Sequence, residues 1–458
     1  MSLTSFVSRL LLLTAIAHGA PSLLPRQELA SYDDGAISPN PANGHWVDTW
    51  TAMPQLTEYN NLPASPFNAS NLVFPNSTIR QTLRMTIPAQ QIRIRFSNAF
   101  SPVDLPITKV TIALPRAEGR QNITGSSGIR SETLQTVSFS GNESITVPAG
   151  ALAVSDPLDF PIKTGQVISI SMYLASGQAT NHVTSHPGSR LDIFYSFGDY
   201  TSAQNLTDPS TTSAQHWFFL SAVEAWSPPA ARAFAIVGDS ITDGRGSYVN
   251  TNTQWPNLLF NRLQSARVTN QNLKAISVVN QAAGGNRVLN DGNGPNAVSR
   301  IDRDVLAQSG VRYAIIFEGV NDIGTAGSDT TNQTIIGDRL IQAYKQIISR
   351  VHTANIPMFG ATITPFGCYN STLQSYSTPE REQTRLRVNE WIRSSGWFDA
   401  VVDFDSIVRD PNNATQLAPY FDSGDCLHLN PAGYQELAAR FPINILQQFA
   451  DGTKTTFT

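Results

Sequence analysis

The chain of 458 residues has little charge, little cysteine and few long hydrophobic runs. Charged residues make up only 14% of it, and no dense basic run occurs. Binding of nucleic acid needs a cationic face, so we expect no nucleic-acid partner. Two cysteines are too few for a four-thiolate zinc site or for a disulfide-dense scaffold. The sequence offers no other metal motif and no phosphate-cradling loop, so we expect neither a metal nor a cofactor.

The first twenty residues have the pattern of a secretory signal peptide. Arg9 precedes a short apolar run at 10–17, and small residues follow up to Ala20. The run is too short to cross a bilayer, and no later segment is apolar enough to do so. We therefore expect a signal peptide at residues 1–20, secretion to the extracellular space, and no stable membrane insertion.

Glycosylation motifs and the cysteine pair agree with secretion. Asn-x-Ser/Thr tripeptides, the acceptors of N-linked sugar, occur at Asn68, Asn76, Asn122, Asn142, Asn205, Asn332, Asn370 and Asn413. In an oxidising compartment Cys368 and Cys426 are expected to form a disulfide. That bond would either clamp a functional loop or serve stability alone.

The two halves of the chain have different patterns. From about 44 to 226, short runs of alternating apolar and polar residues, such as 92–96 and 168–174, lie between clusters of Pro, Gly and Asn. This pattern predicts an antiparallel β-sandwich domain at 27–226. The segment 226–230, which contains two prolines, separates it from a second domain at 231–450.

In the second domain, continuous apolar strands alternate with helices. The expected strands are 233–237, 276–280, 313–317, 358–363 and 400–402, and the expected helices are 254–266, 331–352, 379–395 and 431–449. This alternation predicts a parallel sheet covered by helices on both faces. Functional groups of such sheets lie beyond the carboxyl ends of the strands.

Four short motifs follow strand ends or lie near the end of the domain. They are Gly-Asp-Ser240, Gly284-Gly285-Asn286, Gly-Val-Asn321-Asp and Asp425-Cys-Leu-His428. Each alone is compatible with a plain turn or a helix cap. Asp425 and His428 are three residues apart, a spacing that lets the carboxylate hold the imidazole. The lipase pentapeptide Gly-x-Ser-x-Gly is absent, so the usual nucleophile elbow is not indicated.

Taken together and in this order, the motifs resemble those of the SGNH hydrolase superfamily, the GDSL-type lipases and esterases. The resemblance covers about 233–449 and implies a three-layer α/β/α, flavodoxin-like fold. It also implies Ser240 as nucleophile, His428 as general base and Asp425 as its orienting partner. The implied oxyanion hole consists of the Ser240 amide, the Gly285 amide and the Asn321 side chain. Gly284 competes with Gly285, and Leu429 stands where the family frequently has proline.

The β-rich front half, which opens with Trp46-Val-Asp-Thr-Trp50, is similar to the front domain of some secreted members. The tryptophans Trp46, Trp50 and Trp217 could stack on sugar or pack in the core, and burial favours the core. His182 and His186 have the spacing of a metal pair, but without a third ligand nearby a polar loop at the domain interface is favoured.

The resulting hypothesis is a secreted serine esterase that acts on short acyl esters, such as acetyl esters, of carbohydrates or small alcohols. The expected partner is a small-molecule or polysaccharide ester, and the expected state is a monomer. One alternative is an extracellular lipase or lysophospholipase. The other is a non-catalytic wall-binding protein, since a fold does not guarantee activity.

Overall fold

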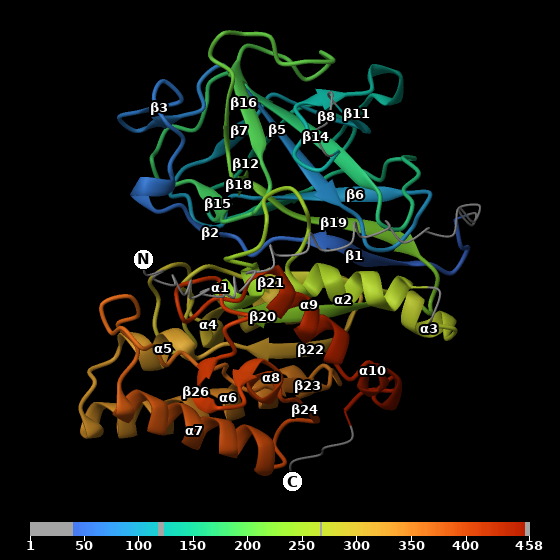
Figure 1. The fold of residues 1–458 in the computed structure, drawn as a ribbon. Helices are drawn as coiled ribbons and strands as arrows, with labels where there is room; N and C mark the ends of the chain where they lie inside the picture. The colour runs from blue at the N-terminus through green and yellow to red at the C-terminus, as the bar shows by residue number, and fades with distance from the viewer. Residues whose placement is uncertain (1–39, 118–122, 266–267, 454–458) are drawn as a thin grey trace, which may run out of the picture.

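The computed structural model describes residues 40–117, 123–265 and 268–453. The predicted signal peptide and the sequon at Asn122 lie outside these residues. The chain consists of an antiparallel β-rich part followed by a part built on a parallel sheet (Figure 1). This is the fold class that the two sequence patterns predict.

The front part contains nineteen strands within the described residues, and its only helical segments there are two short 3-10 turns. The strands are β1 (His45–Thr51), β2 (Gln55–Leu56), β3 (Asn68–Ala69), β4 (Leu72–Val73), β5 (Ser77–Arg84), β6 (Ile92–Ser97), β7 (Leu105–Ile107), β8 (Lys109–Ala113), β9 (Pro115–Arg116), β10 (Gly128–Ile129), β11 (Gln135–Val137), β12 (Ile145–Val147), β13 (Leu152–Val154), β14 (Val167–Leu174), β15 (Thr184–Pro187), β16 (Ile193–Phe197), β17 (Thr212–Ala214), β18 (His216–Phe218) and β19 (Leu220–Ser227). The turns are η1 (Tyr59–Asn61) and η2 (Ser131–Thr133).

Two larger antiparallel sheets form the body of this part. One has six strands in the order β11-β8-β14-β5-β16-β17, and the other has four in the order β1-β19-β6-β13. In Figure 1 the four-stranded sheet lies between the six-stranded sheet and the second part of the chain. The alternating residues Ile92, Ile94 and Phe96 of β6 are fully buried, as a period of two requires.

The second part is a five-stranded parallel sheet with helices around it. Its strands are β20 (Arg232–Gly238), β21 (Ile276–Ala282), β22 (Val311–Phe317), β23 (Met358–Ala361) and β24 (Ala400–Val402), in the order β21-β20-β22-β23-β24. Its helices are α1 (Ser240–Asp243), α2 (Trp255–Gln264), α3 (Gln271–Lys274), α4 (Ala297–Ile301), the π-helical turn η3 (Asp302–Leu306), α5 (Val320–Thr325), α6 (Thr330–His352), α7 (Pro379–Ser394), α8 (Phe404–Val408), α9 (Pro431–Arg440) and α10 (Asn444–Gln448). A small hairpin joins β25 (Arg409–Asp410) to β26 (Asn413–Leu417).

All five predicted parallel strands are present, but two boundaries differ from the sequence analysis. The helix expected at 431–449 is two helices, because Pro442 lacks an amide hydrogen and cannot continue α9. The strand expected at 358–363 ends at Ala361. From there the chain leaves the sheet, and the Ile363 amide donates to the side chain of Asn389 instead of to a neighbouring strand.

The two parts share an extensive polar and packed interface. Strand β1 contacts β21 of the parallel sheet, and the Asp48 amide donates to the Ser309 carbonyl at 2.9 Å. The hydroxyls of Thr86 and Ser277 lie 2.7 Å apart in a buried position. Because buried polar groups must be paired, these bonds fix how one part sits on the other.

Candidate active site

Ser240 stands at the first turn after strand β20, which lies between β21 and β22 in the parallel sheet. Strand β20 ends at Gly238, and Asp239 caps helix α1 by accepting a hydrogen bond from the Ile241 amide at 2.9 Å. The cap makes Ser240 the first residue of the helix and places it at the carboxyl end of the sheet. Its side chain is buried but within reach of one imidazole.

His428 and Asp425 complete a continuous hydrogen-bonded series. Ser240 Oγ lies 2.7 Å from His428 Nε2, and His428 Nδ1 lies 2.6 Å from Asp425 Oδ2. The other carboxylate oxygen, Oδ1, accepts from the backbone amides of Leu427 and His428. The carboxylate is therefore fixed from two directions, and the imidazole can take the tautomer in which Nδ1 carries hydrogen and Nε2 accepts from the serine.

The pKa values of His428 and Asp425 are both lower than usual. Burial lowers the pKa of His428 below 6.5, and the hydrogen bond and charge of Asp425 offset part of that effect. Burial raises the pKa of Asp425, but bonds to His428 and to the loop amides outweigh it, so the net pKa is well below its usual range. The carboxylate is thus ionised and the imidazole neutral near neutral pH, as a general base requires.

The backbone amides of Ser240 and Gly285 are two hydrogen-bond donors that follow the ends of β20 and β21. Among the described residues, the amides of Ser240 and Gly285 donate to no protein acceptor, so both are available to a ligand. Gly285 has φ +72°, and a Cβ there would lie 2.3 Å from Asn293 Nδ2, so this position requires glycine. Gly284 has no positive φ and more room. The requirement for glycine therefore falls on Gly285.

The carboxamide of Asn321 is held at both ends. Its Nδ2 donates to the Asn286 carbonyl at 2.9 Å, and its Oδ1 accepts from the Tyr376 hydroxyl at 3.2 Å. One hydrogen on Nδ2 therefore remains for an external acceptor. Tyr376 has no sequence motif, and sequence reasoning did not find it.

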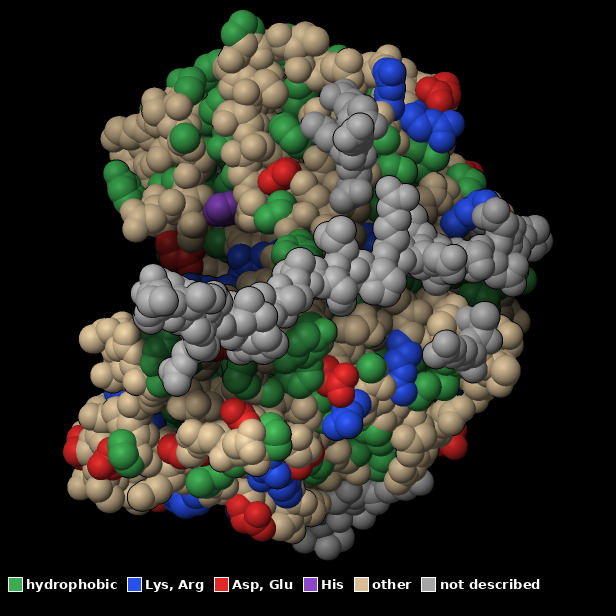
Figure 2. Space-filling view, viewed as in Figure 1, with side chains coloured by type: hydrophobic (Ala, Val, Ile, Leu, Met, Phe, Trp, Pro, Cys, Tyr) green, Lys and Arg blue, Asp and Glu red, His purple; other side chains and the backbone are tan. Residues whose placement is uncertain are grey.

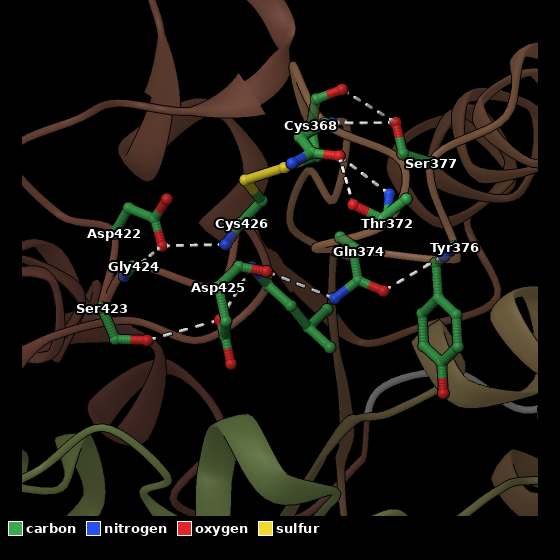
Figure 3. The surroundings of a disulfide bond; sticks show 12 residues. Cys368, Thr372, Gln374, Tyr376, Ser377, Asp422, Ser423, Gly424, Asp425 and Cys426 are labelled. Carbon is green, nitrogen blue, oxygen red and sulfur yellow. Dashed lines mark hydrogen bonds between the residues drawn. A yellow bond between two sulfur atoms is a disulfide. The ribbon is translucent and has the colours of Figure 1, made fainter.

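Tyr376 belongs to the loop that the disulfide anchors. Cys368 and Cys426 form the expected disulfide, and Figure 3 shows it joining the 368–377 loop to the loop that carries Asp425. Gln374 Nε2 donates to the Asp425 carbonyl at 3.3 Å and its Oε1 accepts from the Tyr376 amide at 3.1 Å. The covalent link and these bonds connect the loop of the aspartate to the residue that holds Asn321.

A buried arginine supports the glycine loop from behind. Arg300 of α4 donates to Asn286 Oδ1 at 3.0 Å, to the Gln281 carbonyl at 2.6 Å and to the Gly238 carbonyl at 3.3 Å. It also pairs with Asp304 and Glu318 at 3.0 and 3.1 Å. One side chain thereby fixes the ends of β20 and β21 and the loop of Gly285. No spacing in the sequence pointed to it.

Three carboxyl groups near the site are buried and have raised pKa values. Burial raises the pKa of Glu318 to about 7 and that of Asp322 to about 6. Burial, together with the neighbouring charge of Glu318, raises the pKa of Asp239 well above its usual value. Asp322 accepts from the Val288 and Leu289 amides at 2.8 and 2.9 Å and so anchors the segment after the glycine loop.

The front part contributes His186 to the far side of helix α1. His186 Nε2 lies 2.9 Å from Asp243 Oδ1, and Nδ1 lies 3.0 Å from the Met53 carbonyl. His182 is exposed whereas His186 is buried, so the two do not form a pair. No metal-ligating cluster occurs among the described residues. The expected position at the interface is correct for His186, but this residue lies on strand β15 and not in a loop.

The three tryptophans considered for sugar binding pack against protein. Trp50 is buried and meets Trp217 edge to face, with ring centroids 5.0 Å apart. Trp46 packs on Trp226 at 5.2 Å and lies under the guanidinium of Arg93. These contacts fit the core interpretation.

Six sequon asparagines of the described chain are exposed, at Asn76, Asn142, Asn205, Asn332, Asn370 and Asn413, and Asn68 is half-buried. Within the described ranges, no helix combines the length and the apolar character that a membrane span needs.

Comparison with known proteins identifies the second part of the chain. The family model described as GDSL-like Lipase/Acylhydrolase matches residues 234–441. A comparison with curated proteins found no match. Similar solved structures include an inhibitor-bound aryl esterase from M. smegmatis, at 14% identity over 48% of this chain and 99% of that one, with a TM-score of 0.36.

Two further structures have similar scores. An acetyl xylan esterase named AlAXEase is 19% identical over 45% of this chain and 96% of its own, with a TM-score of 0.33. A GDSL-like lipase from Bacteroides thetaiotaomicron is 13% identical over 46% of this chain and 85% of its own, with a TM-score of 0.32. The family match identifies residues 234–441 of this chain as a GDSL-like lipase/acylhydrolase domain, which makes the protein a carboxylic ester hydrolase.

Proposed function

We propose that the protein is a secreted serine esterase that removes short acyl groups, such as acetyl, from carbohydrates or small alcohols. The observation that carries the proposal is the series from Ser240 Oγ through His428 to Asp425, with spacings of 2.7 and 2.6 Å. A serine hydroxyl is a weak nucleophile unless a base within hydrogen-bond reach removes its proton, and His428 is that base.

The reaction has two stages. Ser240 Oγ attacks the ester carbonyl while His428 Nε2 takes the hydroxyl proton, and the same nitrogen then returns the proton to the departing alcohol. Water attacks the acyl-enzyme with His428 again as base, which releases the acid and restores the serine. Asp425 stabilises the imidazolium that forms in each stage and keeps the ring oriented.

The carbonyl oxygen gains negative charge as the centre becomes tetrahedral. The amides of Ser240 and Gly285 and the remaining Nδ2 hydrogen of Asn321 are the donors that we assign to it. Donors held in place for such an oxygen contribute about 3–4 kcal/mol each to the lowering of the barrier. Arg300 and Tyr376 serve the same end, because they restrain the two loops that carry these donors.

The surroundings of Ser240 favour a polar substrate over a long acyl chain. Asp243 ends helix α1, Arg245 follows that helix, and Asn321 belongs to α5. Arg190 reaches Asp243 from the front part. Charged groups of this kind lose hydration when a long apolar chain covers them, which opposes binding of a lipid. The chain-length preference therefore separates our proposal from a lipase.

Secretion is supported by the leader-like first residues, by the exposed sequons and by the disulfide of Cys368 and Cys426. Secretion is tested by looking for the protein in the culture medium of the producing cell. We expect the released protein to start after residue 20 and to lose mass on treatment with a glycosidase for N-linked sugar.

The test of the active site is covalent labelling with a fluorophosphonate, which reacts only with an activated serine. We expect labelling of the wild type, none of Ser240→Ala, and normal labelling of Ser349→Ala, which changes an exposed serine on α6. Labelling that persists in Ser240→Ala, or fails in the folded wild type, would contradict the assignment of the nucleophile.

The test of the acyl group is a series of p-nitrophenyl esters from acetate to palmitate. We expect kcat/KM to fall with chain length and the enzyme to release acetate from acetylated polysaccharide. A rate that rises toward the long esters would favour the lipase alternative instead.

A further inference from the structure

Two arginines from different parts of the molecule lie near helix α1, and each has one long contact to a carboxylate. Arg190 follows β15 in the front part, and its backbone has φ +56°, a strained conformation for this residue. Its side chain is 21% exposed, and its Nε is buried with no hydrogen-bond partner among the described residues. Its one side-chain contact is a long one, 3.5 Å from Nη2 to Asp243 Oδ2.

The backbone of Arg190 is nevertheless fixed. Its carbonyl accepts from the Asn250 amide at 2.9 Å, and the Asn250 side chain donates to Asp192 at 2.7 Å. The loop is therefore tied to the segment that follows the nucleophile helix. The loop therefore presents a guanidinium with one long contact, to Asp243, and the N–H donors that this contact leaves over can bind an external acceptor.

Arg245 comes from the catalytic part, five residues after Ser240. Its amide donates to the Ser240 carbonyl at 2.9 Å, and its own carbonyl accepts from the Tyr434 hydroxyl at 2.5 Å. Its side chain is 63% exposed, and its one contact within the described residues is 3.9 Å from Nε to Asp425 Oδ2. A firmly held backbone thus presents a guanidinium whose donors face solvent beside the catalytic aspartate.

The two carboxylates near these arginines already have closer partners. Asp243 lies 2.9 Å from His186, and Asp425 lies 2.6 Å from His428. Each arginine therefore shares its carboxylate with a closer histidine, and its own contact to that carboxylate is long. Both also act on the catalytic histidine: burial is the main cause of its lowered pKa, and the positive charges of Arg245 and Arg190 add to it.

The boundary between the two parts of the molecule is indented (Figure 2). Figure 2 shows an indentation between the two parts of the molecule, on the left of the view, with Lys or Arg side chains at its back. Figure 1 places β15 above this level and α1 below it. A substrate that enters here would contact both parts of the chain.

We propose that Arg190 and Arg245 together bind a carboxylate of the substrate, so that the enzyme prefers esters that carry an acidic group close to the scissile bond. The inference rests on the proposed esterase function and names its substrate class. Guanidinium groups suit this task because their planar N–H donors match the two oxygens of a carboxylate. Because Arg190 belongs to the front part, the proposal also gives that part a direct role in binding the substrate.

The carboxylate can belong to either side of the ester. On the alcohol side it would be that of an acidic sugar, as in an acetylated polyuronate. On the acyl side it would be that of a dicarboxylic acid bound as a half ester. The two arms of the experiment separate these sources.

The acyl arm compares p-nitrophenyl hemisuccinate with p-nitrophenyl butyrate, and the alcohol arm compares acetylated polygalacturonate with acetylated xylan free of uronate. We expect the wild type to favour the acidic member in one arm by about tenfold or more in kcat/KM, the effect of one charge-assisted contact. Arg190→Gln and Arg245→Gln should each remove most of that preference. Arg312→Gln, an exposed arginine on β22, should retain it.

A second measurement needs no variant. Because added salt screens charge, the preference of the wild type should shrink as NaCl rises from low to about 0.5 M, while hydrolysis of the neutral ester changes little. Equal rates on acidic and neutral esters at low salt, or a preference that both glutamine variants retain, would overturn the proposal. Failure of the esterase function is a different result, because the wild type would then hydrolyse neither p-nitrophenyl ester.

Discussion

Two histidine–aspartate pairs flank the helix of the nucleophile, one from each part of the molecule. The catalytic part supplies His428 with Asp425, and the front part supplies His186, which pairs with Asp243 of the helix itself. Both imidazoles are buried, and both lie within hydrogen-bond distance of a carboxylate. The pairs differ in what the second ring nitrogen meets.

That second contact decides what each ring can do. His428 Nε2 faces the Ser240 hydroxyl, which can donate, so a neutral ring satisfies both of its bonds. His186 faces a carboxylate on one side and the Met53 carbonyl on the other, and both are acceptors. The ring of His428 lies next to a hydroxyl and can act as a base, whereas the ring of His186 lies between two acceptors from different parts of the molecule and ties these parts together.

The largest difference is expected when each histidine is replaced by glutamine. His428→Gln removes the only base that the described residues place within hydrogen-bond distance of Ser240 Oγ, so we expect kcat to fall by about 10⁴-fold or more. His186→Gln leaves that base in place and should lower kcat by roughly tenfold or less, through a misplaced helix. Steady-state kinetics on p-nitrophenyl acetate measures both. Comparable losses in two folded variants would refute the distinction between the pairs.

Replacement of the two aspartates by asparagine should also lower kcat to different extents, with smaller losses than for the histidines. Asp425→Asn keeps the shape but changes the tautomer and removes the charge that stabilises the imidazolium, so we expect a loss of about 10³–10⁴-fold in kcat. Asp243→Asn lies one turn from Ser240 but touches no reacting atom. We expect it to change kcat far less than Asp425→Asn, and its effect should appear mainly in the thermal midpoint.

For the free energy of unfolding we expect the reverse order: replacing His186 should cost more stability than replacing His428, although it costs less activity. His186→Ala leaves Asp243 in a buried position with only the distant Arg190, so we expect a loss of about 2–4 kcal/mol in the free energy of unfolding. The matched variant His352→Ala breaks a similar pair with Asp399, which lies away from the domain interface. Of these two pairs only that of His186 joins the two parts, within an interface that other bonds also hold, so scanning calorimetry should show a less cooperative transition for His186→Ala than for His352→Ala. Equal cooperativity in the two variants would argue against a contribution of His186 to the coupling.

The sequence predicted those site residues that belong to short motifs or that directly follow a strand. Asp425 and His428 are three residues apart, and Ser240, Gly285 and Asn321 each follow a strand, so motif and strand order sufficed to bring them together. His186 and Asp243 are 57 residues apart, and Tyr376 reaches Asn321 across 55. No periodicity links such positions, because their contact depends on how the loops and the two parts pack. The break of the last helix at Pro442 was legible in the sequence but was not predicted.

The pH dependence of activity should reflect the environment of His428. Only the neutral ring is a base, so kcat/KM falls as the pH drops through its pKa, and burial places that pKa below 6.5. We therefore expect the acid limb on a neutral ester to have its midpoint below pH 6.5. Arg245→Gln removes a positive charge that opposes protonation, so its midpoint should shift upward. A midpoint above 6.5 in the wild type would contradict this account of the site.

The smallest effect concerns Glu318, which lies behind the site and takes no part in the comparison of the histidines. Its pKa is raised by burial from 4.5 to about 7, so the folded state holds a proton that the unfolded state has released. Stability from this source is fully present below pH 4.5 and is lost as the pH rises through about 7. Asp322, with its pKa raised to about 6, acts in the same direction.

Glu318→Gln should therefore reduce the drop in thermal midpoint between pH 5 and pH 8, whereas Glu436→Gln, on the surface of α9, should not. An unchanged drop in Glu318→Gln would mean that its carboxyl is ionised throughout, held by Arg300 more strongly than burial opposes it.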